Sequence, residues 1–315
     1  MSWFEYVLQQ LITGLTNGMI IALVALGYTM VYGIIELINF AHGDLVMLGS
    51  FLALTLIGAC GLGQSPWIGL PLLLIAVPAF CAVLNWSVDR VAYRPIRQAP
   101  KLTALVTAIG ISFIFVNLGF FWGGMPMAVF GGGNAPAAQK DVPDLIGFFN
   151  LLGKNCQVRF TVKDALVVAV TVPLMIALTW FVRSTRLGTA MRATAQNPVA
   201  ARLMGIDVDR VIGATFVIGG ALAGVAAVVQ SLYYNTVSFQ MGYRVGMDAF
   251  TAAVLGGIGN LPGAVLGAVV IGLVRAFSDG YLSTQWTNAL VFLMLILMLV
   301  FRPSGLLGAH VREKV

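Results

Sequence analysis

The sequence predicts an all-α protein that crosses a membrane about eight times, with one additional re-entrant or broken helix and two internal pseudo-repeats. The 315 residues are 59% hydrophobic and only 10% charged, whereas soluble domains average roughly 45–50% apolar and about 25% charged residues. Thirty-six glycines are present, as expected where membrane helices pack closely through small residues. Because apolar runs recur along its whole length, we treat 1–315 as one transmembrane domain.

The expected spans follow from membrane thickness. A hydrocarbon core about 30 Å thick requires about 20 apolar residues in a helix. A shorter apolar piece cannot cross alone and is expected to form a re-entrant or half helix, here at 247–257. The polar segment 33–44 is a second interruption, and paired interruptions are typical of internal repeats with a pathway between them. The predicted spans are 8–33, 45–62, 66–87, 102–123, 163–182, 211–234, 262–278 and 285–301.

Two long loops fix the expected orientation. Residues 124–162 are rich in glycine and proline with mixed charge, whereas 183–210 carry five arginines. Lysine and arginine concentrate on the cytoplasmic side of membrane proteins. Placing 88–101, 183–210 and the C-terminal tail inside puts twelve of the 18 basic residues there. We therefore expect the N-terminus outside, the C-terminus in the cytoplasm, 124–162 in the periplasm and 183–210 in the cytoplasm.

The arginine-rich loop contains a short helix, predicted at 198–204. Asn197 caps free N–H groups, Pro198 suits the first turn, and Gly205 suits the left-handed position after the last turn. Two alanines leave a shallow face, and two arginines can pair with acidic groups. This pattern predicts a docking helix for another protein, the alternative being a loop helix that lies on the membrane surface. The candidate docking residues are Arg192, Asn197, Ala200, Ala201, Arg202 and Gly205.

Polar residues also interrupt the apolar sequence in two other places. Segment 33–44 holds four polar side chains within nine residues, which indicates a pathway or, alternatively, an ordinary cytoplasmic turn. In 252–274, glycines, an asparagine and a proline break an apolar run, which is tolerated where protein or a water-filled cavity surrounds the backbone. Close packing explains the glycine stripe there as well as a pore does. The candidate pathway residues are Glu36, Asn39, His42, Asp44, Gly257, Gly259 and Asn260.

Several kinds of chemistry are not indicated. The chain has no G-x-x-x-x-G-K-[ST], H-E-x-x-H or G-x-S-x-G motif, so we expect neither an ATP site nor a catalytic residue. Two histidines do not make a metal site, and no cofactor is expected. The basic residues are spread over loops beside apolar spans, which favours the lipid bilayer over nucleic acid as a partner. Arg275 and Asp279, four residues apart, can pair at the end of the seventh span and are interpreted as structural.

Five stretches resemble the LivH type of permease subunit from bacterial branched-chain amino-acid ABC importers. They are ALGYTMVYGIIELINFAHGD (25–44), YRPIR (93–97), TRLGTAMRATAQNPVAARLMGI (185–206), LGGIGNLPGAVLGA (255–268) and FRPSGLLG (301–308). The resemblance implies an inner-membrane subunit without an ATP site of its own, which moves branched-chain or related amino acids inward. It also implies four partners: a second permease of the LivM type, two cytoplasmic ATPase subunits and a periplasmic amino-acid-binding protein.

For 197–205, the resemblance implies the coupling segment that docks into the ATPase. Permeases of ABC importers often carry Glu-Ala-Ala-x-x-x-Gly there, and Ala200, Ala201 and Gly205 match that pattern. Val199 stands at the Glu position, so no ion pair is available from it. Two other functions stay open: a urea or amide ABC permease, and an ion-coupled secondary transporter in which Glu36, Asp44 and Asp248 carry protons. A channel or membrane scaffold fits less well, because no ring of charge indicates a filter.

Overall fold

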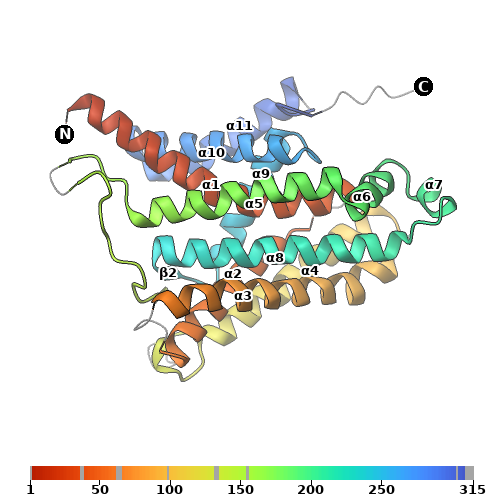
Figure 1. Cartoon of the computed structure of the whole chain (residues 1–315), viewed down its shortest axis with the longest axis horizontal. Helices are drawn as coiled ribbons and strands as arrows, with labels where there is room; N and C mark the ends of the chain where they lie inside the picture. Colours follow the sequence, from red (N-terminus) through yellow and green to blue (C-terminus); the bar gives the residue numbers. More distant parts are fainter. Residues whose placement is uncertain are drawn as a thin grey trace.

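The computed structural model describes residues 2–35, 39–61, 66–97, 99–130, 135–153, 156–302 and 304–308. Within these ranges it is built from eleven α-helices and one small two-stranded sheet, which confirms the predicted all-α class (Figure 1). The helices are α1 Trp3–Ile35, α2 Ala41–Ala59, α3 Pro66–Val88, α4 Lys101–Gly123, α5 Val162–Ser184, α6 Arg186–Gln196, α7 Pro198–Leu203, α8 Val208–Tyr234, α9 Met241–Gly256, α10 Leu261–Tyr281 and α11 Thr284–Phe301; the strands are β1 Lys140–Asp141 and β2 Thr236–Val237.

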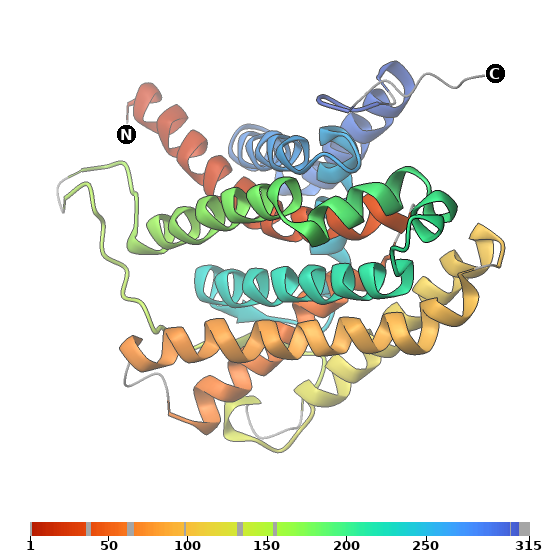
Figure 2. The same ribbon diagram turned by 45° about the vertical axis from the view of Figure 1, so that its right-hand side comes forward.

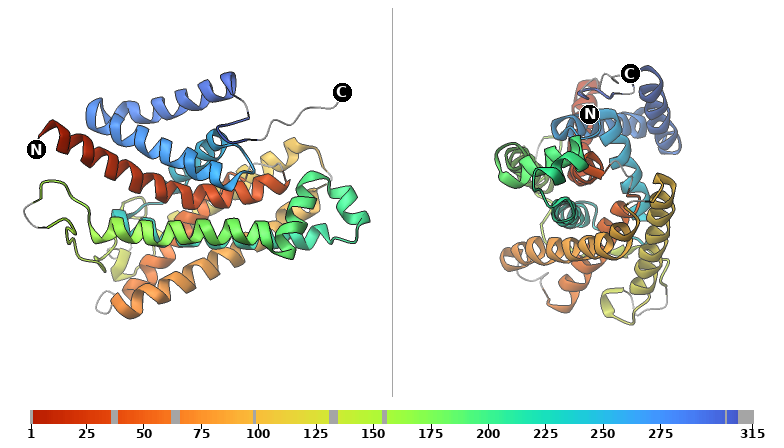
Figure 3. Two further views of the ribbon diagram at one scale, coloured as in Figure 1. Left: turned by 45° about the horizontal axis from the view of Figure 1, so that its top comes forward. Right: turned by 90° about the vertical axis from the view of Figure 1, so that its right-hand side faces the viewer.

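Eight helices are long and apolar enough to cross a membrane, and they correspond to the eight predicted spans. The broken element is α9, whose 16 residues cover about 24 Å at 1.5 Å per residue. α9 follows β2, which pairs with β1 of the 124–162 loop at one end of the bundle. The helix ends near α6, at the other end of the bundle. This extra passage explains why α1 begins and α11 ends at opposite ends of the molecule (Figure 3).

The helices divide into a buried centre and a lipid-facing periphery. The apolar windows of α1, α2 and α8 are 67–78% buried, whereas those of α3, α4, α5 and α11 are only 11–28% buried. Seen end-on, α8 lies near the middle of the bundle (Figure 3). The outer helices expose large side chains such as Phe113 and Trp180, and this apolar surface is suited to lipid rather than to water.

The break between α9 and α10 is held by the C-terminal segment. Gly257 and Gly259 take positive φ angles of 102° and 84°, which suit glycine and end α9. The carbonyls of Leu255 and Gly256 then accept hydrogen bonds from the backbone N–H groups of Leu306 and Leu307, at 2.8 and 3.0 Å. Backbone groups freed by the break are therefore satisfied within the protein, as a membrane requires.

The glycine stripe of α10 packs against α9. A side chain added at Gly263 would meet Gly256, and one added at Gly267 would meet Ala252. Close helix packing, one of the two explanations considered from the sequence, accounts for both of these positions.

The 124–162 loop covers the end of the bundle away from α7 (Figure 2). The Lys163 ammonium donates to the side-chain oxygens of Asp144 and Asn235, at 2.9 Å each, and so ties the loop to α5 and α8. The hydrogen bond from Lys163 lowers the pKa of Asp144 below its usual range. Cys60 and Cys156, both exposed, are free thiols rather than a disulfide.

Candidate functional site

Local sequence builds α7 as a short helix bounded at both ends. The Asn197 side-chain oxygen accepts from the N–H groups of Val199 and Ala200, both at 3.0 Å. After the last turn, Gly205 adopts φ 82°. Its N–H bonds Arg202 O, while the N–H of Ile206 bonds Ala201 O, each at 3.0 Å. This double hydrogen bond is a Schellman motif, so the predicted boundaries of the helix are confirmed to within one residue.

The two alanines of α7 point in different directions. Ala201 is only 4% exposed and packs into the main core, so of the two only Ala200 remains on the surface. The outer surface is instead made by Val199, Leu203 and Met204, which are 68%, 83% and 82% exposed. We call these three side chains the α7 apolar face. The sequence analysis did not include Leu203 and Met204 among the candidate docking residues. The four-residue spacing of Val199 and Leu203 places these two side chains on one side of a helix and would have identified Leu203.

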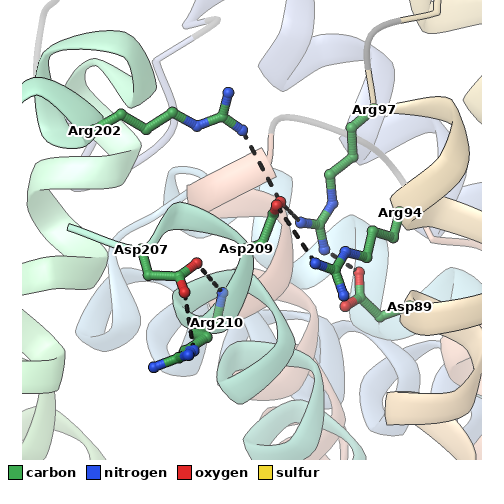
Figure 4. Close-up of polar contacts among 7 residues, drawn as sticks. All are labelled: Asp89, Arg94, Arg97, Arg202, Asp207, Asp209 and Arg210. Carbon is green, nitrogen blue, oxygen red and sulfur yellow. Dashed lines mark hydrogen bonds and ion pairs between the residues drawn. The ribbon is translucent and has the colours of Figure 1, made fainter. Parts of the chain in front are cut away.

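A charged network joins the base of α7 to the end of α3 (Figure 4). α3 continues as a π-helical turn over Asp89–Tyr93 and a 3₁₀ turn over Arg94–Ile96. Arg97, just beyond, donates to both Asp89 and Asp209. Asp209, in the first turn of α8, also lies 3.8 Å from Arg94 and 4.0 Å from Arg202. Two segments more than a hundred residues apart thus meet at one carboxylate.

The predicted docking arginines differ in their surroundings. Arg202 belongs to the Asp209 network, yet 57% of its side chain is exposed. Arg192, in α6, donates to the backbone carbonyl of Arg183 at 3.1 Å and also stays exposed. Arg210 pairs with Asp207 at 2.9 Å within the first turn of α8 (Figure 4). The end of the bundle that carries α7 therefore presents cationic side chains around an apolar face.

The predicted pathway residues in the first turn of α2 and just before it lie inside the bundle. Asn39, His42 and Asp44 are 4%, 1% and 1% exposed. Asn39 accepts from the Tyr93 hydroxyl at 3.1 Å, and Asp44 accepts from the hydroxyl of Ser112. The His42 ring packs edge-on against Tyr28, with 4.8 Å between centroids, and neither ring nitrogen has a hydrogen-bond partner among the described residues.

The pathway residues at the α9–α10 break lie elsewhere. Asn260 caps α10 by accepting from the Gly263 N–H at 3.1 Å, and its amide donates to Leu307 O at 2.7 Å. Gly259 and Asn260 line a cavity of about 660 Å³ between α1, α5 and α6. Gly257 packs against the C-terminal segment instead. Glu36 lies outside the described residues.

The ion pair predicted between Arg275 and Asp279 is wrong. Arg275 donates to Asp248 of α9 at 2.6 Å and to Asn288 at 3.0 Å, whereas Asp279 accepts from Thr287. Arg275 pairs with the carboxylate of Asp248 on α9, and not with that of Asp279 on its own helix, because its side chain is directed toward α9. Among the described residues, no group of three or more His, Cys, Asp or Glu side chains is arranged to hold a metal ion.

Comparisons with known proteins cover almost the whole chain. Residues 10–299 match the family model described as the permease component of branched-chain amino acid transport systems. The LivH permease of the high-affinity branched-chain amino acid transport system of Salmonella typhimurium is 41% identical over 99% of both chains. LivH of Escherichia coli is 40% identical over 99% of both, and BraD of Pseudomonas aeruginosa 40% over 98% of both. No solved structure matches the chain.

Proposed function

The chain belongs to the family of permease components of branched-chain amino acid transport systems, and on that premise we propose that it is a transmembrane subunit of an ABC importer. It carries branched-chain amino acids (leucine, isoleucine or valine) into the cell, and separate ATPase subunits drive the transport. The near full-length similarity to the LivH and BraD permeases favours this function over an ion-coupled transporter.

The α7 apolar face is the proposed contact with the ATPase. Two large apolar side chains exposed on the six-residue helix, and a third on the residue that caps it, need a partner, because such surfaces are removed from water at interfaces. Arg202, on the same helix, and Arg192, on the preceding helix α6, are exposed and add positive charge to this end of the bundle. The Val199 side chain fills the position of an acidic residue in related motifs, so docking here depends on apolar contact rather than on an ion pair from that position.

The orientation and the other partners follow from this proposal. The α7 end faces the cytoplasm, and the 124–162 loop, with the start of α1, faces outward. A second permease of the LivM type, a second ATPase subunit and a periplasmic amino-acid-binding protein complete the importer. The exposed thiols test the orientation: a membrane-impermeant maleimide added to spheroplasts should label Cys60 and Cys156, whereas labelling only after lysis would contradict it.

The buried polar residues at the start of α2 and just before it are proposed as part of the pathway. Asn39, His42 and Asp44 are enclosed here, and His42 has unpartnered ring nitrogens among the described residues. Buried polar atoms without partners are costly, which favours a role in a second conformation in which the path is open. Gly257, Gly259 and Asn260 are proposed to shape the wall at the α9–α10 break.

The test of coupling uses proteoliposomes that contain the complete importer and ATP. We expect Leu203→Ser and Met204→Ser to lower ATP-driven leucine uptake by at least tenfold while leaving the amount of folded permease unchanged, because both side chains are more than 80% exposed. Leu152→Ser, an exposed leucine in the 124–162 loop, is the matched control. Wild-type uptake by both α7 variants would contradict docking through this face.

A further inference from the structure

A second cavity lies at the end of the bundle opposite α7. It measures about 470 Å³ and is formed where α1, α8, α9 and α10 meet beside β2. Ligand pockets in proteins typically span about 300–1,000 Å³. None of the pathway residues predicted from the sequence lines it.

One wall of this cavity carries equal numbers of positive and negative side chains. It contains Arg244, Asp248, Arg275 and Asp279, two cations and two anions. The Arg275–Asp248 pair is fixed, because both side chains are mostly buried and 2.6 Å apart. Arg244 is exposed and has no ion-pair partner among the described residues, while Asp279 accepts from the hydroxyl of Thr287. The Arg244 guanidinium and the Asp279 carboxylate can therefore bind groups of opposite charge on a ligand.

The remaining walls of the cavity provide an apolar surface and a hydrogen-bond acceptor, the side-chain oxygen of Gln230, that has no partner among the described residues. Ile20, Ile21 and Val245 line the cavity from α1 and α9. Gln230, from α8, is only 7% exposed, and its side-chain oxygen has no hydrogen-bond partner among the described residues. Buried polar atoms in folded proteins are nearly always paired, because an unpaired one has lost its hydrogen bonds to water without replacement. Gln230 therefore offers an acceptor that a donor in the cavity would satisfy.

We propose that this cavity binds the transported amino acid as a zwitterion on its way in. Arg244 pairs with the α-carboxylate, Asp279 and Gln230 accept from the α-ammonium group, and the aliphatic side chain lies against Ile20, Ile21 and Val245. Two opposite charges in one ligand match a wall with no net charge. This site rests on the proposed transport of branched-chain amino acids and adds the residues that hold the substrate.

The experiment measures protection of a reporter thiol in the cavity wall. Cys60→Ser and Cys156→Ser remove the exposed thiols, Cys81 stays because it is buried, and Met241→Cys, at a lining position outside the proposed ligand contacts, places the reporter. The permease complex, without nucleotide or binding protein, is treated with a small maleimide at increasing leucine concentration. We expect leucine to slow alkylation at least tenfold, whereas 4-methylpentanoate and isopentylamine, which are leucine without its ammonium group and without its carboxylate, need concentrations more than tenfold higher.

Variants of the charged wall decide the assignment. Because a hydrogen bond to a charged group contributes about 1.5–3 kcal/mol, Arg244→Gln should raise the half-protecting leucine concentration about 10- to 100-fold. Asp279→Asn should shift it in the same direction, and Arg159→Gln, an exposed arginine outside the cavity, should not. An unchanged value in Arg244→Gln, or equal protection by 4-methylpentanoate, overturns the site.

Failure of the site and failure of the proposed function remain distinguishable. Uptake of leucine by the reporter complex in proteoliposomes, without protection at concentrations that saturate uptake, overturns only the cavity assignment. Absence of ATP-driven leucine uptake by the complete wild-type importer overturns the proposed function itself.

Discussion

Replacing Arg97 by alanine is expected to destabilise the protein strongly. Arg97 holds Asp89 and Asp209, and the exposed fractions of the three side chains are 12%, 5% and 35%. Asp209 can regain water when the arginine is removed, but Asp89 cannot. Breaking a buried pair by removing one partner costs about 3–5 kcal/mol, because an uncompensated charge stays behind. At roughly 2–4 °C per kcal/mol, the apparent melting temperature should fall by about 6–20 °C.

The assay is thermal unfolding of the purified protein in detergent, with three further variants. Asp89→Asn in the Arg97→Ala background removes the stranded charge and should recover about half of the loss or more. Arg97→Lys keeps the charge but cannot hold both carboxylates with one planar group, so an intermediate loss is expected. Arg159→Ala, an exposed arginine, is the control. A melting temperature of Arg97→Ala equal to that of the wild type, or no recovery with Asp89→Asn, would refute the reasoning.

Three further predictions concern other parts of the chain. At Gly205, φ is +82° and an added side chain would meet open space, so a substitution there strains only the backbone. Gly205→Val should therefore lower the free energy of unfolding by about 1–2 kcal/mol, and Gly205→Asn by less, as measured by thermal unfolding. Because the pKa of Asp144 is lowered, its bond to Lys163 stabilises the fold at neutral pH and this contribution is lost as pH falls through that pKa. The difference in melting temperature between wild type and Asp144→Asn should therefore shrink between about pH 7 and about pH 3, and a constant difference would argue against the pair. Truncation after Arg302 should shorten the cellular half-life of the membrane-inserted protein relative to truncation after Gly308, since it removes the bonds to Leu255 and Gly256; equal half-lives would contradict this.

The sequence was sufficient wherever the cause of a structure is local. Apolar length predicted the eight spans, and the pattern Asn197, Pro198 and Gly205 predicted α7, because capping is decided by neighbouring residues. The break at the end of α9 followed from its glycines in the same way. The internal pseudo-repeats stay a prediction.

Contacts between distant segments could not be predicted in this way. Arg97 meets Asp209 across 112 positions of the chain, and Arg275 prefers Asp248 to the carboxylate four residues along. The burial of Ala201 beside an exposed Ala200 depends on how α7 lies against the core, which residue spacing does not encode. The second cavity likewise arises from four helices that only the folded chain brings together.

The closure of the α9–α10 break by residues 304–308 also bears on how the protein is made. These residues are synthesised after α1 to α11, so the carbonyls of Leu255 and Gly256 lack these hydrogen-bond donors until the segment that follows α11 has been made. A chain cut short after α11 would keep these helices but would leave the carbonyls of Leu255 and Gly256 without the donors of Leu306 and Leu307. Closure of the α9–α10 break therefore waits for a segment that follows the last membrane helix, so the order of synthesis and the order of folding are linked at this point.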